Sequence, residues 1–146
     1  MSERTPLETS LVPAERLHAQ ILMEAGYLWM EMGEPHKARE VFLGAAALLP
    51  KSEVPHLGLG TLESAQGRHE KALQAYRAAQ RLAPRSALPR AHAGEALLFL
   101  GKEREALKEL QIAREVDPDG DGGKLASALM DAHASGVFAR RKTRKV

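Results

Sequence analysis

The sequence predicts an all-α protein made of three copies of one helix pair followed by a closing helix. Three observations predict this fold. Residue types recur with a period of 34 along the chain. Aromatic residues are only 4% of the sequence, so the core must be built mainly from Leu and Ala, which are strong helix formers. Proline follows each copy at Pro50, Pro84 and Pro118, where it would stop a helix.

The 34-residue period includes residues of several kinds besides proline. A shift by one period superimposes two sets of glycines, two sets of alanines and one set of large apolar residues. Six registered positions in three copies, prolines included, are hard to obtain by accident. Besides the prolines, the registered residues are Gly26, Gly60 and Gly94; Gly33, Gly67 and Gly101; Ala38, Ala72 and Ala106; Phe42, Tyr76 and Leu110; and Ala45, Ala79 and Ala113.

Each registered residue has a physical role in a helix pair. A small residue midway along the first helix, such as Gly26, lets the second helix approach closely. A glycine at the turn, such as Gly33, can adopt a positive φ and end the first helix. The small Ala38 on the second helix permits tight packing, and Phe42, four residues later, fills the gap beside it.

The elements follow from this register. Residues 1–13 are expected to be a flexible N-terminus, residues 14–138 the repeat domain, and residues 139–146 a basic tail. A final helix should cover the open apolar end of the stack, because helical repeats need such a cap to stay in solution. The expected helices are 14–32 and 35–49, 53–66 and 69–82, 87–100 and 103–116, and the capping helix 124–138.

This pattern resembles the tetratricopeptide repeat, with copies at 19–52, 53–86 and 87–120. The resemblance implies a superhelix whose concave groove is lined by the first helix of each repeat and binds a polypeptide. It places four positions of each first helix in that groove. They are Gln20, Met23, Tyr27 and Met30; Val54, Leu57, Thr61 and Ser64; and Leu88, Ala91, Glu95 and Leu98, with His92 beside them.

The groove positions are mostly apolar, and the two methionines among them suit varied apolar ligands. The alternative reading, that several of these residues are plain core, stays open, most of all for Leu57 and Leu98. Some repeats of this kind clamp the terminal carboxylate of heat-shock chaperones with Lys, Asn and Arg side chains. The matching positions here hold none of these types, so a clamp of that kind is not expected. They are Met23, Tyr27, Gly58, Leu88 and His92.

A closer resemblance rests on two runs, His56-Leu57-Gly58-Leu59-Gly60 and Pro89-Arg90-Ala91-His92-Ala93-Gly94-Glu95. These runs resemble the class II chaperones of bacterial type III secretion systems. The resemblance implies a cytoplasmic bacterial protein that holds hydrophobic translocator subunits before their secretion, with weak homodimerisation as a further option. A general tetratricopeptide-repeat scaffold that joins two soluble proteins is the alternative.

Other kinds of chemistry find little support. There is no cysteine, no nucleophile motif and no phosphate-binding loop, so we expect no enzyme, no cofactor, no metal and no small-molecule substrate. The run Asp117–Gly122 resembles the start of a calcium loop, but Ala128 stands where the bidentate Glu belongs, and we interpret the run as a flexible turn. Nucleic-acid binding would rest only on the basic residues of 140–145, and we expect a solvated tail there.

Overall fold

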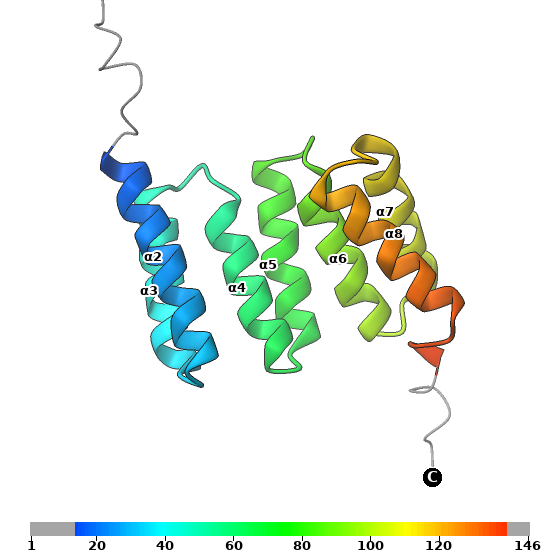
Figure 1. Ribbon diagram of the computed structural model, residues 1–146, viewed down its shortest axis with the longest axis horizontal. Helices are drawn as coiled ribbons and strands as arrows, with labels where there is room; N and C mark the ends of the chain where they lie inside the picture. The colour runs from blue at the N-terminus through cyan, green and yellow to red at the C-terminus, as the bar shows by residue number, and fades with distance from the viewer. Residues whose placement is uncertain (1–13, 140–146) are drawn as a thin grey trace, which may run out of the picture.

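The computed structural model describes residues 14–139, and these residues form seven helices and no strand (Figure 1). The expected N-terminal segment 1–13 and nearly all of the basic tail lie outside the described residues. No helix within 14–139 is both long and apolar enough to cross a membrane. The helices are α2 (Ala14–Glu31), α3 (Pro35–Leu48), α4 (Val54–Ala65), α5 (His69–Leu82), α6 (Ala87–Phe99), α7 (Glu103–Val116) and α8 (Asp121–Ala134).

The turns inside the helix pairs confirm the role predicted for the second set of glycines. Gly33, Gly67 and Gly101 have φ angles of 75°, 74° and 75°. This region of backbone space costs little for glycine and is strained for other residues. Each of these glycines therefore ends the first helix of its repeat and lets the chain turn back as the second helix.

The close approach within each pair is also confirmed. A Cβ atom built on Gly26 would overlap the ring of Phe42, and one built on Gly60 would overlap the ring of Tyr76. In the third repeat, a Cβ on Gly94 would lie 2.6 Å from Leu110 Cδ2. The large side chain of each second helix thus occupies the space left by the glycine of the first, and a larger residue at these glycines would push the helices apart.

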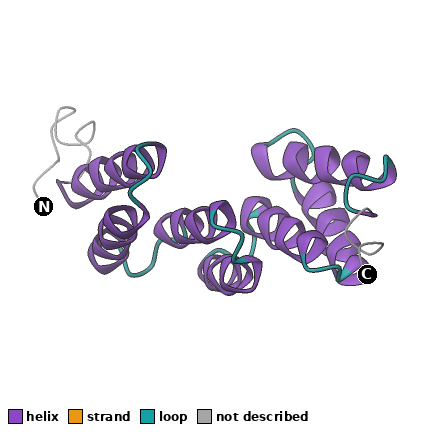
Figure 2. Ribbon diagram, turned by 90° about the horizontal axis from the view of Figure 1, so that it is seen from below, coloured by secondary structure: helices purple, strands orange, loops and turns teal. Residues whose placement is uncertain are grey.

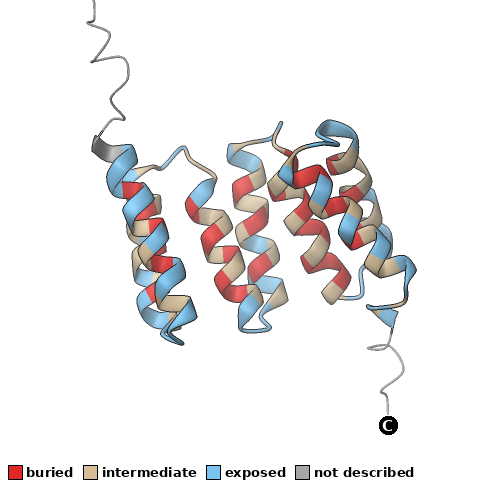
Figure 3. Ribbon diagram, viewed as in Figure 1, coloured by how far each residue is buried: buried red, intermediate tan, exposed pale blue. Residues whose placement is uncertain are grey.

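The helix pairs stack side by side into an elongated array rather than around one centre (Figure 2). The core is correspondingly divided into three clusters along the array. One cluster surrounds Phe42 in the first repeat, the next surrounds Tyr76, and the last surrounds Leu97 and Leu110. Buried residues are dense on α4 to α6, whereas α2 shows long exposed stretches (Figure 3).

The capping helix differs from the range predicted for it. We expected 124–138, but α8 spans Asp121–Ala134. Its start lies 34 residues after Ala87, where α6 begins, so α8 occupies the place of the first helix of a fourth repeat. It ends before Gly136, whose φ is 81°.

The helix starts early because its glycines are needed for packing. A Cβ on Gly122 would lie 2.5 Å from the backbone nitrogen of Leu88, and Gly123 packs on Asp117 and Pro118. The Gly120 N–H donates to the Asp117 carboxylate at 3.1 Å, which secures the turn before the helix. Asp121 to Gly123 are therefore helical, and the flexible turn expected over Asp117–Gly122 is shorter than predicted.

Candidate peptide-binding face

The predicted groove residues lie on α2, α4 and α6, the first helices of the three repeats. Their exposure varies strongly along the array. Tyr27 is 39% exposed, Val54 is 45% exposed, and Gln20 is also exposed. The remaining members that a ligand could reach are half-buried: Met30, Leu57, Thr61, Ser64, Leu88, His92 and Glu95.

Three predicted groove residues belong to the protein core instead. Met23 is 7% exposed, Leu98 is 4% exposed, and Ala91 is fully buried. Met23 packs in the cluster around Phe42, and Leu98 packs with Leu129 of α8 in the third cluster. The capping helix covers the third repeat, so Leu98 is not available to a ligand. The core reading that stayed open for Leu98 is the correct one.

A pocket of about 500 Å³ lies between the N-terminal halves of α2 and α4. It includes three of the predicted positions, Gln20, Met23 and Val54. The pocket has room for a large apolar side chain, and most of its lining is apolar at the α4 end. The other lining residues are Arg16, Ala19, Leu49, Ser52, Glu53 and Pro55.

The sequence reasoning missed most of this pocket because it treated only the first helices as groove-forming. Leu49, Ser52 and Glu53 come from the connection between α3 and α4. Their lining role depends on how one repeat is placed against the next, which no residue pattern within a repeat specifies. Pro55, at the start of α4, carried a usable signal, because proline is favoured in the first turn of a helix and helix starts border such clefts.

The middle of the face is polar, and its centre is Tyr76 from the second helix α5. The Tyr76 ring stacks on the His92 imidazole with centroids 5.0 Å apart. His92 Nδ1 in turn lies 3.8 Å from the Glu95 carboxylate. Burial raises the pKa of Tyr76 to about 12, although hydrogen bonding to Thr61 lowers it, and Glu95 raises it further. The phenol therefore stays protonated and can hydrogen-bond at neutral pH.

This arrangement brings together the predicted residues Thr61, His92 and Glu95, which come from two different repeats. Thr61 Oγ1 also donates to the Leu57 carbonyl at 2.9 Å, so its hydroxyl is held in place. Tyr76 was assigned only to the core from its place in the repeat. Its hydroxyl was the missed signal, because Phe42 and Leu110 hold the same repeat position without a polar atom.

At the first repeat the face is aromatic. The Tyr27 ring meets the buried Phe42 ring edge to face, with centroids 5.2 Å apart. Burial of part of the side chain raises the pKa of Tyr27 as well. Tyr27 thus has one ring edge fixed by the core while 39% of its surface stays accessible, which suits a side chain that contacts a ligand.

The described residues offer little for catalysis or metal binding. No group of three or more His, Asp or Glu side chains within 14–139 is arranged to hold a metal ion. The one buried carboxylate among the core residues, Glu63, pairs with Arg39 and lies 3.5 Å from Arg68. This group links the second helix of the first repeat to α4 and therefore serves the stack.

Comparison with known proteins agrees with the repeat. The family model described as tetratricopeptide repeat matches residues 56–86, which covers most of the second repeat. No curated protein sequence matches the chain.

Solved structures match over most of the chain. The type III secretion translocator chaperone SycD of Yersinia enterocolitica matches with a TM-score of 0.69 and 23% identity, over 78% of this chain and 88% of that one. SycD in complex with a peptide of the translocator YopD matches with a TM-score of 0.69 and 22% identity, over 84% and 93%. The second tetratricopeptide domain of human RPAP3, in complex with an HSP70 peptide, matches with a TM-score of 0.67 and 17% identity, over 81% and 98%.

These likenesses establish the fold. The chain is a tetratricopeptide-repeat superhelix, as its 34-residue period predicts.

Proposed function

We propose that this protein binds an extended apolar segment of another protein along the face formed by α2, α4 and α6. The observation that supports the proposal is the juxtaposition of an apolar pocket and a polar centre on this one face. The 500 Å³ pocket at Val54 accepts a large side chain, and the hydroxyl and imidazole groups around Tyr76 can bond to a peptide backbone. An extended strand presents side chains and backbone groups in this alternating manner.

We further propose that the bound segment belongs to a hydrophobic translocator subunit, and that the protein is a type III secretion chaperone of the bacterial cytoplasm. Two runs of residues resemble that chaperone class, and SycD with its YopD peptide has the same fold. An apolar pocket suits such a subunit, because its membrane-inserting segments need shielding from water before secretion. In this role the protein works by binding and not by catalysis.

The first experiment measures binding of the labelled YopD peptide by fluorescence anisotropy, with wild type and Val54→Asp compared. Val54 is the first residue of α4, where a carboxylate favours the helix, so the variant should fold normally. It puts a charge at the pocket mouth and should weaken peptide binding at least tenfold. Leu82→Asp is the matched control, since Leu82 is 38% exposed on α5 and lies outside the pocket.

The outcomes separate the two readings. Groove-dependent binding of the YopD peptide supports the chaperone, and deletion of residues 140–146 should leave that binding nearly unchanged. If the peptide fails to bind but a co-purified soluble protein binds in a manner sensitive to Val54→Asp, the general scaffold is correct. If the tail deletion abolishes binding and Val54→Asp does not affect it, the α2, α4 and α6 face is not the binding site.

A further inference from the structure

A second pocket lies away from the proposed peptide-binding face, between α5 and α6. It has a volume of about 350 Å³ and is lined by Arg77, Gln80, Arg81, Pro84 and Arg90. Arg90 precedes the groove residue Ala91 by one position, which turns it about 100° around the helix. The pocket therefore opens on a different side of the molecule, and its use does not depend on the groove.

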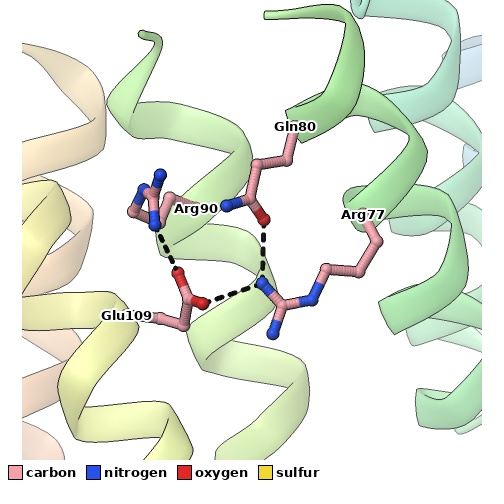
Figure 4. Close-up of polar contacts among 4 residues, drawn as sticks. All are labelled: Arg77, Gln80, Arg90 and Glu109. Atoms are coloured by element: carbon pink, nitrogen blue, oxygen red, sulfur yellow. Dashed lines mark hydrogen bonds and ion pairs between the residues drawn. The ribbon is translucent and has the colours of Figure 1, made fainter. Parts of the chain in front are cut away.

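The arginines of this pocket share one carboxylate. Arg77 donates to Glu109 of α7 at 2.8 Å, and Arg90 donates to the other oxygen of the same carboxylate at 3.1 Å (Figure 4). Arg77 also donates to the Gln80 side chain at 2.8 Å. The structure gives Arg81 no ion pair within residues 14–139. Three guanidinium groups thus meet one negative charge, which leaves an excess of two positive charges.

The guanidinium groups are held in position but not saturated. Only one nitrogen each of Arg77 and Arg90 bonds to Glu109, and every guanidinium has five N–H donors. The two side chains are 32% and 21% exposed, so their remaining donors can reach a ligand. Since Glu109 already restricts both side chains, an anion that binds them loses less conformational entropy than it would on free arginines.

We propose that this pocket binds an acidic segment of a protein partner through its Asp or Glu side chains. Arg77 and Arg81 lie one helical turn apart, about 6 Å along the axis. Alternate residues of an extended peptide are about 6.7 Å apart, so successive carboxylates on one side of a strand match this spacing. Arg90 from the neighbouring helix provides a third donor group beside the line of the strand.

Features of the pocket favour a polypeptide over a nucleic acid. No aromatic side chain lines it, and base stacking is a main source of affinity for single strands. Glu109 would also repel a continuous phosphate backbone. A peptide with spaced carboxylates can avoid Glu109, and its uncharged residues can contact Pro84 and the Gln80 amide.

The test is a nuclear magnetic resonance titration of the full chain, labelled with ¹⁵N, with an acetylated Glu-Ala-Glu-Ala-Glu-Ala-Glu peptide at low salt. We expect saturable shifts at the side-chain N–H signals of Gln80, Arg81 and Arg90. Arg81→Gln should weaken this binding about three- to fivefold, as expected for an exposed charge pair. Arg104→Gln, an exposed arginine outside the pocket, should leave the affinity unchanged.

Several outcomes would overturn the proposal. One is a set of shifts confined to residues 140–146, because the basic tail would then be the acidic-peptide site. Another is equal weakening by Arg81→Gln and Arg104→Gln, which would mean a diffuse charge effect. A uridine oligonucleotide that binds at Arg81 and Arg90 more tightly than the peptide would reassign the pocket to nucleic acid. Retained binding in Val54→Asp is expected, since that variant alters only the groove.

Discussion

Leu28 and Leu62 occupy the same position of the repeat, one period of 34 apart, yet they have opposite surroundings. Leu62 is 1% exposed and packs among Met23, Ala38 and Phe42 of the preceding repeat. Leu28 is 56% exposed, because no repeat precedes it within the described residues. The burial of a first helix is thus decided by the neighbour before it and not by its own sequence.

A second position shows the same difference. Ile21 of α2 is 53% exposed, whereas Pro55 and Pro89 at the equivalent positions of α4 and α6 are fully buried. The other end of the array is different, because α8 takes the place of a further first helix and covers α6 and α7. The array is therefore closed at its C-terminal end and open at α2, as expected for a quasi-linear fold in which each repeat contacts only its neighbours.

The largest effect should come from truncating the two equivalent leucines. Leu62→Ala leaves a cavity in the core and should lower the free energy of unfolding by about 2 to 5 kcal/mol. Leu28→Ala removes a largely solvated side chain and should change it by no more than about 0.5 kcal/mol. Urea unfolding followed by circular dichroism measures both. Equal losses would mean that another segment covers α2 in solution.

A pH dependence should distinguish the second repeat from the others. Tyr76 titrates, whereas Phe42 and Leu110 at the same position do not. The folded protein raises the Tyr76 pKa from 10 to about 12, so it holds the phenolic proton more tightly than the unfolded chain does. The resulting stability is complete below pH 10 and is lost as the pH rises to 12.

The expected loss is roughly 2 to 3 kcal/mol for a shift of this size. Tyr76→Phe introduces the residue of the first repeat and should remove this part of the pH dependence. The measurement is the difference in unfolding free energy between wild type and variant at pH 9 and at pH 11.5. A constant difference would show that the Tyr76 pKa is not raised by folding.

Overpacking between the paired helices tests the same comparison from the inside. Ala72 is fully buried between α4 and α5, and Ala72→Leu should lower the free energy of unfolding by about 1 to 3 kcal/mol. The equivalent variant Ala38→Leu should cost less, because α2 can move outward without displacing a preceding repeat. Thermal melts of both variants give the comparison. A melt unchanged by Ala72→Leu would contradict the helix pairing.

The smallest effect concerns the exposed apolar residues of α2. Leu17, Ile21, Leu28 and Met32 are 49%, 53%, 56% and 61% exposed. Weak homodimerisation stays a prediction, and this open end is the surface that would support it. Sedimentation equilibrium should show weaker self-association for Ile21→Glu with Leu28→Glu, with unchanged helix content. Leu43→Glu on α3 is the control, and an equal effect from it would place the contact elsewhere.

The sequence by itself was enough to predict the helices and their pairing. The evidence was strong because each glycine, alanine and large apolar residue acts within one repeat. Gly33 ends its helix through its own φ angle, and Gly26 meets Phe42 only 16 residues away. The exact period also contained the start of α8 at Asp121, which the glycine-rich run Gly120–Gly123 concealed.

Only the tertiary structure decided which groove positions a ligand can reach. Met23 and Leu98 sit at groove positions yet are buried, because their environment depends on the repeat or helix that follows. The pocket beside Val54 and the arginine pocket at Glu109 both form between repeats. Contacts within a repeat recur every 34 residues and are readable from the chain, whereas contacts between repeats depend on the angle and spacing of the stack, which no single repeat specifies.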